Sequence, residues 1–257
     1  MATVLTSRDG AVLTITLNRP EAYNAFTREL HADFHRALSE EASDPEVRAV
    51  VVTGAGKAFC AGQDIREFSE MPGSIGTALE QTYHPNIRAL RALPKPVIAA
   101  VNGAAAGAGL SLAVACDVRV ASEAAVFVPG FIGIGLVPDA GGTWFLHRLL
   151  GYARAFEWMS SNRRLSAGEA LAWGLVSEAI PSTEFETRVT EIAATWAALP
   201  TRALAASKRL FDNAYDASLE DQLTREAEEQ ELATETEDFR EGVTAFLEKR
   251  PPSFSGH

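Results

Sequence analysis

The stretch Val97-Ile98-Ala99-Ala100-Val101-Asn102-Gly103-Ala104-Ala105-Ala106-Gly107-Ala108-Gly109-Leu110 decides the fold class of this chain. Its first five residues are apolar and partly β-branched, which is typical of a strand buried on both faces. Asn102-Gly103 is a turn signal, and the small residues after it allow two backbones to approach closely. The apolar residues from Leu110 to Cys116 then have the composition of a buried helix. The sequence therefore predicts a strand, a tight turn and a helix, as in an α/β protein.

The same region imitates a membrane-spanning helix, since only two residues between Val97 and Cys116 are polar. Its length is about the ~20 residues that a spanning helix needs. However, Gly and Ala dominate it, two prolines precede it, and the Asn102-Gly103 turn lies in its middle. We therefore expect no membrane association here.

Strand and helix signals alternate along the chain up to about Ile180. A hairpin with an Asp9-Gly10 turn opens the chain, and amphipathic helices and β-branched runs follow in alternation. From about Phe185 onward only helical patterns occur. This order predicts an α/β core over residues 1–195 and a helical C-terminal region over residues 196–257.

Composition and charge narrow the function classes. Hydrophobic residues make up 47% of the 257 residues and charged residues 22%, the balance of an ordinary globular protein. The net charge of −11 argues against nucleic-acid binding, which needs a basic surface. Eleven acidic and two basic residues lie between Asp216 and Glu241, which we interpret as a solvated helix face. Cys60 and Cys116 show no disulfide spacing, and Arg8-Asp9 interrupts any signal peptide, so we expect a cytoplasmic protein.

Several cofactor motifs are absent from the sequence. The glycines at 103, 107 and 109 lack dinucleotide-site spacing, and Gly54-Ala55-Gly56-Lys57-Ala58 lacks the hydroxyl residue of a phosphate loop. His31 and His35 are four residues apart on a predicted helix. With no third ligand nearby and charged neighbours around them, we interpret them as an exposed helix face. We therefore expect no metal and no redox or nucleotide cofactor.

Asp139 is the candidate catalytic residue. It lies among apolar and small residues from Gly135 to Trp144, and burial would raise its pKa toward the range of a general base. Two small-residue turns, Cys60–Asp64 and Gly103–Gly109, can present bare backbone N–H groups, which suit a developing oxyanion. One carboxylate beside such amides suits proton transfer next to a carbonyl. The alternatives are that Asp139 caps a turn or helix and that the turns only pack closely.

These residues resemble the crotonase superfamily, the enoyl-CoA hydratase/isomerase group, over essentially the full length of the chain. The resemblance implies a spiral of ββα units and a helical C-terminal trimerisation region, with homotrimers or dimers of trimers. It also implies acyl-CoA substrates and no cofactor besides the coenzyme A of the substrate. The segments that carry it are Leu17–Pro20, Lys57–Ile65, Lys95–Gly103, the Gly107 turn, Cys116-Asp117 and Pro138–Thr143.

Position by position, the resemblance places an oxyanion hole at the backbone N–H groups of Gln63 and Ala108. It also implies a set of positions that bind coenzyme A, some near the adenine and some reaching the nucleotide end from a neighbouring subunit. The first group is Ala61, Asp64 and Ile65, and the second is Phe246 and Lys249.

Two departures from the family pattern favour one branch of it. Hydratases of the family hold water between two glutamates, but the matching positions here are Ser111 and Phe131. Asp139 matches the single carboxylate of the isomerases, and the surrounding segments are most similar to isomerases of 1,2-epoxyphenylacetyl-CoA. The resemblance implies an isomerase that shifts a 3,4 double bond to the 2,3 position or converts this epoxide to an oxepin. Phe131 and Trp144 would shape an apolar acyl pocket, and His147 is left without a role.

Two alternatives to the isomerase stay open at this point. One is a hydratase or another crotonase-type acyl-CoA enzyme, in which a different group orders the water. The other is a non-catalytic acyl-CoA-binding protein that makes its contacts through the acidic C-terminal helices.

Overall fold

Two β-sheets organise the chain, and the computed structural model describes residues 2–68 and 74–257 of it. The strands are β1 (Val4–Asp9), β2 (Val12–Leu17), β3 (Ala49–Gly54), β4 (Ala58–Cys60), β5 (Val97–Val101), β6 (Ala104–Ala106), β7 (Val118–Ser122), β8 (Val126–Val128), β9 (Leu165–Ser166) and β10 (Glu178–Ile180). The larger sheet has the order β1-β2-β3-β5-β7-β10, and the smaller has the order β4-β6-β8-β9.

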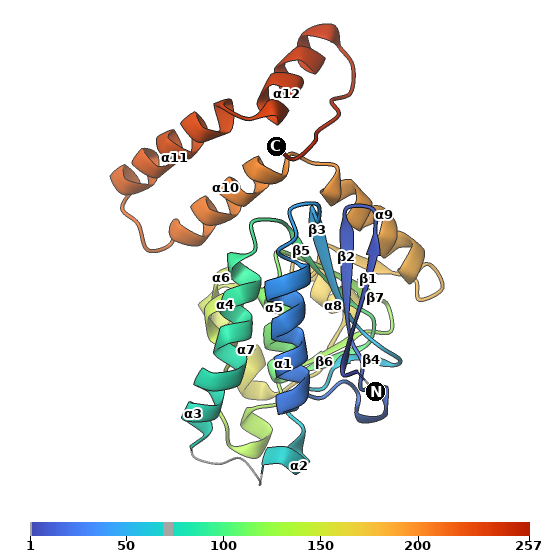
Figure 1. Cartoon of the computed structure of the whole chain (residues 1–257). Helices are drawn as coiled ribbons and strands as arrows, with labels where there is room; N and C mark the ends of the chain where they lie inside the picture. The colour runs from blue at the N-terminus through green and yellow to red at the C-terminus, as the bar shows by residue number, and fades with distance from the viewer. Residues whose placement is uncertain (1, 69–73) are drawn as a thin grey trace.

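Helices surround these sheets and form most of the C-terminal region, which ends in a tail without helix (Figure 1). They are α1 (Arg28–Arg36), α2 (Ile65–Phe68), α3 (Ile75–Ala78), α4 (His84–Ala92), α5 (Ala108–Ala115), α6 (Gly142–Leu150), α7 (Tyr152–Ser161), α8 (Ala167–Ala172), α9 (Phe185–Ala197), α10 (Thr201–Asn213), α11 (Leu219–Thr234) and α12 (Glu237–Glu248). A π-helical segment, Leu79–Tyr83, leads into α4. Among the described helices, none has the length and apolar character needed to cross a bilayer.

The chain alternates between the two sheets. β3 and β4, then β5 and β6, then β7 and β8 each place one strand in either sheet before the next helix. Pairing between successive units is parallel in both sheets, for example of Ile98 with Val51 and Val118. This repeat of two strands and a helix is the predicted spiral of ββα units, and it confirms the α/β fold class.

The stretch Val97–Leu110, which decides the fold class, forms the centre of this arrangement. Val97–Val101 is the completely buried strand β5, and α5 is buried along its whole length. The prediction of a single turn over Gly103–Gly109 was incomplete, because three of its residues form β6. β4 was not predicted as a strand, and its last residue, Cys60, was assigned to a turn. Strands of three residues are too short to show an alternating pattern in the sequence.

The first helix corrects a second prediction. Thr27 caps α1 by accepting a hydrogen bond from Leu30 N at 3.2 Å. His31, however, is only 5% exposed and stacks on Phe26 with ring centroids 4.6 Å apart. The interpretation of both histidines as an exposed helix face was therefore wrong for His31, while His35 is exposed. The reason is tertiary: α4 packs against this side of α1.

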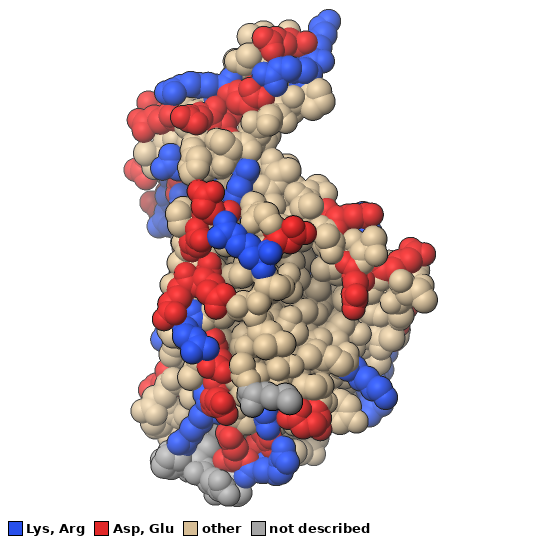
Figure 2. Space-filling model, turned by 45° about the vertical axis from the view of Figure 1, so that its right-hand side comes forward, with Lys and Arg blue, Asp and Glu red and all other residues tan. Residues whose placement is uncertain are grey.

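The C-terminal helices α10 to α12 stand apart from the sheets in Figure 1. The predicted boundary between residues 195 and 196 falls in the last turn of α9. Arg91 of α4 pairs with Asp212 of α10, and Lys208 of α10 pairs with Asp117 at 2.9 Å, which anchors α10 to the core. α11 has no buried residue, and acidic side chains gather on the C-terminal helices in Figure 2. This exposure agrees with the predicted solvated face.

Candidate active site

Two short parallel strands bring two loops together at one edge of the smaller sheet. β4 pairs with β6, with Cys60 opposite Ala105, so the segments that leave both strands lie side by side. Gly62 has a φ of +88°, and a Cβ there would lie 2.9 Å from Ala106 O and 3.4 Å from Ala108 N. Glycine alone tolerates this conformation and this approach without strain. The next residue, Gln63, is thereby placed close to the start of α5.

The two amides predicted to form an oxyanion hole have no backbone acceptor within residues 2–68 and 74–257. Hydrogen bonds between Phe26 and this loop use Gly62 O (2.7 Å) and Asp64 N (2.9 Å), so the Gln63 N–H takes no part in them. Ala108 is the first residue of α5, and the N–H groups of a first helical turn have no intrahelical acceptor. The helix dipole also makes this end partly positive. These donors can stabilise charge on a carbonyl oxygen.

The main chain holds Asp139 beside the first turn of α5. Ser111 Oγ donates a hydrogen bond to Asp139 O at 2.9 Å, and Gly142 N donates to the same oxygen at 2.8 Å. Ala140 and Gly141 then adopt φ values of +48° and +80°. A left-handed alanine is strained, and such strain concentrates at functional sites. One short helix thus positions both the Ala108 amide and the candidate base.

The Asp139 side chain is not a cap. Its Oδ1 is buried without a hydrogen-bond partner in the described part of the chain, and α6 begins without a side-chain cap. The alternative role as a helix cap is therefore wrong. Burial raises the pKa of Asp139 from 3.8 to about 6, because the ionised form loses water contacts. A carboxylate in this state can exchange a proton near neutral pH.

Tyr83 is a site residue that the sequence did not reveal. Its hydroxyl donates a hydrogen bond to Gln63 Oε1. Burial raises the pKa of Tyr83 well above 10, and the nearby negative charge of Asp139 adds to this effect. Tyr83 therefore holds the Gln63 side chain and lies close enough to Asp139 to be affected by its charge. No motif surrounds it, so the sequence offers no signal for this role.

Ser111 and Phe131, the two positions that the resemblance matched to hydratase glutamates, make other contacts here. Ser111 is 1% exposed, and its hydroxyl is used to hold Asp139 O. Phe131 is 6% exposed, and a Cβ at Gly107 would lie 3.9 Å from its Cζ. Phe131 thus forms an apolar wall beside the turn that leads to Ala108. Neither position supplies a carboxylate.

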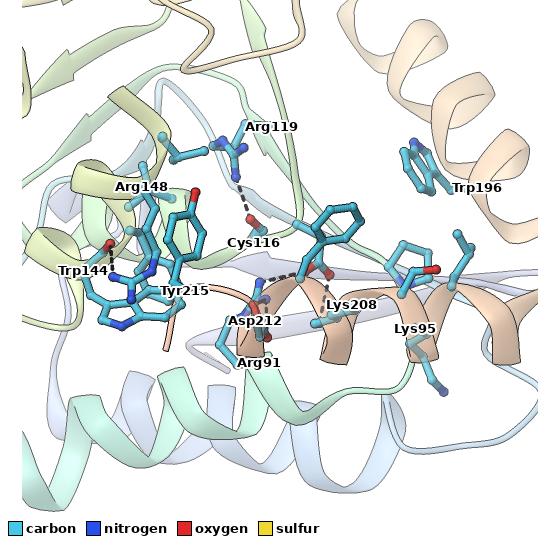
Figure 3. Close-up of a pocket in the computed structure, with 18 residues that line it drawn as sticks. Arg91, Lys95, Cys116, Arg119, Trp144, Arg148, Trp196, Lys208, Asp212 and Tyr215 are labelled. Atoms are coloured by element: carbon cyan, nitrogen blue, oxygen red, sulfur yellow. Dashed lines mark hydrogen bonds and ion pairs between the residues drawn. The ribbon is translucent and has the colours of Figure 1, made fainter. Parts of the chain in front are cut away.

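Trp144 lies away from this cluster. The Arg148 guanidinium stacks 3.6 Å from the centroid of its ring, and Tyr215, in the turn after α10, faces the same guanidinium (Figure 3). These residues line a cavity of about 440 Å³ against α10, and Asp139 is not among the described residues that line it. Helix α6 turns Trp144 toward α10, so the structure does not bring it to the predicted acyl pocket. His147 is exposed and contacts Tyr152 instead.

The predicted coenzyme A positions form two separate groups. Ala61 and Ile65 are exposed beside the Gln63 loop. Asp64 is buried and pairs with Arg66 at 2.8 Å and Arg19 at 3.0 Å, and these contacts lower its pKa. Its side chain therefore stabilises the loop.

The second group, Phe246 and Lys249, belongs to α12 and its C-terminal end. In one chain these residues lie at the opposite end of the molecule from α2 (Figure 1). No three His, Cys, Asp or Glu side chains within the described ranges are arranged to hold a metal ion.

The sequence of the chain matches a known protein family. A sequence model described as Enoyl-CoA hydratase/isomerase matches residues 7–257. The chain belongs to the enoyl-CoA hydratase/isomerase family. It is 40% identical to 1,2-epoxyphenylacetyl-CoA isomerase of Escherichia coli (strain K12), over 100% of this chain and 99% of the relative.

Two further matches agree with the family but differ in the reaction they name. A protein of Rhodobacter capsulatus called "Probable enoyl-CoA hydratase" is 46% identical, over 94% of this chain and 93% of the relative. The solved structure of enoyl-CoA hydratase from Bacillus anthracis superposes with a TM-score of 0.93 at 34% identity, over 99% of this chain and 100% of that one. The matches confirm the predicted family and its crotonase fold, while the names include both isomerase and hydratase.

Proposed function

We propose that this protein is an acyl-CoA isomerase that moves a double bond from the 3,4 to the 2,3 position of a thioester. The observation that carries the proposal is Asp139, a half-buried residue whose carboxylate Oδ1 is buried without a partner among the described residues, beside two main-chain donors. Ser111 and Phe131 stand where hydratases hold glutamates. One carboxylate suffices to remove and return a proton, whereas water addition needs a further group to activate the water.

The chemistry follows from this arrangement. The thioester carbonyl accepts hydrogen bonds from the N–H groups of Gln63 and Ala108. Asp139 takes a proton from C2, and the electron pair of that C–H bond spreads into a dienolate whose oxygen the two amides stabilise. Each such donor is worth about 2.7–4 kcal/mol in the transition state. Protonated Asp139 then delivers the proton to C4, which leaves the double bond between C2 and C3.

In this proposal no atom is gained or lost, and coenzyme A enters as part of the substrate without a further cofactor. The same arrangement supports the isomerisation of 1,2-epoxyphenylacetyl-CoA to the oxepin. This epoxide is the compound in the name of the Escherichia coli relative. Phe131 would line the acyl side of this site.

We also propose that the protein works as a homotrimer or a dimer of trimers. The C-terminal helices expose large apolar side chains, among them Phe211 (76%), Phe246 (82%) and Leu247 (74%), and such patches mark interfaces. Because Phe246 and Lys249 are distant from the Ile65 loop within one chain, a neighbouring subunit would bring them to the coenzyme A.

A panel of acyl-CoA thioesters, followed by mass spectrometry and NMR, tests the function directly. We expect 3-enoyl-CoA or the ring epoxide to give a product of unchanged mass with a moved double bond. Hydration would add the mass of one water. Hydration of crotonyl-CoA that is faster than every isomerisation in the panel would favour the hydratase, which the Rhodobacter capsulatus relative supports. Tight binding without turnover would favour a binding protein.

The pH dependence of the reaction follows from the pKa of Asp139. Its carboxylate form is the base, and burial raises its pKa to about 6. We therefore expect kcat/KM for the 3-enoyl thioester to increase with pH, with a midpoint near 6, and then to level off. A steady-state profile in matched-ionic-strength buffers measures this. A profile that is flat from about pH 5 to about pH 8 would contradict the role of a buried carboxylate base.

A further inference from the structure

We propose that Tyr83 is a positioning residue of this reaction. It acts through the Gln63 side chain to hold the backbone N–H of Gln63 toward the thioester carbonyl. The inference rests on the proposed function and adds a residue that neither the family matches nor the sequence motifs assign. It begins from one contact, the hydrogen bond that the Tyr83 hydroxyl donates to Gln63 Oε1 across 20 positions in the chain.

Gln63 is held from two directions. On the main-chain side, Phe26 bonds to Gly62 O and Asp64 N, the groups on either side of Gln63. On the side-chain side, Nε2 donates to the neighbouring Asp64 O at 3.3 Å, and Oε1 accepts from the Tyr83 hydroxyl, which comes from a distant segment. The N–H and the side chain leave Gln63 from atoms one bond apart. Restraining both therefore restrains the direction in which the N–H points.

The Tyr83 ring is itself rigidly packed. Its centroid lies 4.1 Å from that of His31 and 5.4 Å from that of Phe26, with interplanar angles of 69° and 76°. His31 and Phe26 in turn stack on each other. Edge-to-face contacts of this kind are favourable, and Tyr83 is only 5% exposed. The hydroxyl is therefore aimed by a cluster of three rings.

Asn86 determines which ring nitrogen of His31 carries the proton. Asn86 Nδ2 donates to His31 O at 3.1 Å, a carbonyl that can only accept, which sets the orientation of the amide. The same Nδ2 lies 3.0 Å from His31 Nδ1, so that nitrogen accepts and the ring proton is on Nε2. Asn86 Oδ1 accepts from His35 Nδ1 at 3.1 Å. Burial lowers the pKa of His31 to about 3, so the ring stays neutral near neutral pH.

Tyr83 also stays neutral, because burial and the charge of Asp139 raise its pKa well above 10. The hydroxyl keeps its proton and remains a donor to Gln63 throughout the working pH range. The cluster therefore orients the Tyr83 hydroxyl, and neither Tyr83 nor His31 changes its protonation near neutral pH. The pH midpoint in a Tyr83 variant should remain that of Asp139.

The first test separates an action through Gln63 from simple core packing. Tyr83→Phe keeps the ring and removes the hydroxyl, and Gln63→Met keeps the length of the side chain and removes the acceptor. We expect Tyr83→Phe to lower kcat about tenfold, the equivalent of one hydrogen bond, with little change in KM. In the Gln63→Met background, Tyr83→Phe should have no further effect, because both changes remove the same contact.

Tyr152→Phe is the matched control, since this exposed tyrosine on α7 loses the same atom away from the site. It should keep the kcat of the wild type. An unchanged kcat in Tyr83→Phe would overturn the inference, and so would fully multiplicative effects in the double variant.

The second test does not depend on turnover. Hexanoyl-CoA with a carbon-13 carbonyl is bound to each protein, and the infrared carbonyl band is compared with that in solution. Wild type and Asp139→Asn should shift the band to lower frequency, and Tyr83→Phe should lose much of this shift. An equal shift in Tyr83→Phe and wild type, or no shift in wild type, overturns the positioning role. A preserved Tyr83 effect in a protein that isomerises no thioester would instead reject the proposed function alone.

Discussion

Asp139→Asn is expected to abolish double-bond isomerisation, with kcat lowered by about 10²–10⁴-fold, the usual contribution of a positioned acid–base group. Asparagine has the shape of aspartate but can neither take nor return the proton. The main-chain contacts of Asp139 O to Ser111 and Gly142 do not involve the side chain and should survive. Steady-state kinetics and isothermal titration with a saturated acyl-CoA should therefore show lost turnover and retained binding.

The same substitution should stabilise the fold at alkaline pH. The pKa of Asp139 is raised from 3.8 to about 6, so folding favours the protonated form and the ionised form costs stability as pH rises through this window. Removing that charge should increase the unfolding free energy by about 1–2 kcal/mol at about pH 8, after discounting for partial exposure. Below the unfolded-state pKa the gain should disappear. Urea unfolding at two pH values measures it.

Asp216→Asn is the matched control for this experiment, because the Asp216 side chain is 79% exposed and lies 3.7 Å from Arg148. It should leave both activity and stability near the wild-type values. Lost activity together with gained stability cannot arise from misfolding. Full activity in Asp139→Asn would remove this residue from the mechanism.

Gly62→Ala should reduce kcat by about 10²–10³-fold, as expected when an oxyanion donor is displaced. The added Cβ would lie 2.9 Å from Ala106 O at a φ of +88°, and both facts require the loop to move. The movement separates the Gln63 amide from the Ala108 amide, which should impair the transition state more than substrate binding. Kinetic constants together with circular dichroism distinguish this effect from loss of the fold.

Two other glycines serve as controls that separate the effect of a positive φ from the effect of the added Cβ near the site. Gly174 has a φ of +73° with nothing within 4 Å of an added Cβ, so Gly174→Ala should cost about 1–2 kcal/mol of stability and no activity. Gly168 has neither a positive φ nor a close neighbour, so Gly168→Ala should keep the activity of the wild type. Wild-type kcat in Gly62→Ala would contradict the assignment of the Gln63 loop to the oxyanion hole.

Local sequence patterns were sufficient for the main elements of the fold. The apolar run Val97–Val101 became β5, and the Asp9-Gly10 turn became the first hairpin. Each is encoded by residues within a few positions of one another. β4 and β6 escaped prediction because three residues are too few to show a periodicity, and their pairing joins positions far apart in the chain.

The sequence by itself determined the α/β class, the family and the likeness of Asp139 to a catalytic carboxylate, because composition, periodicity and motif spacing are local properties. Only the tertiary structure decided that Asp139 Oδ1 is buried and caps no helix, that Tyr83 bonds to Gln63, and that Trp144 lines a cavity against α10. It also buried His31, whose partner Asn86 lies 55 positions away. Burial and hydrogen bonding depend on which distant segments meet, and no local pattern in the chain records that.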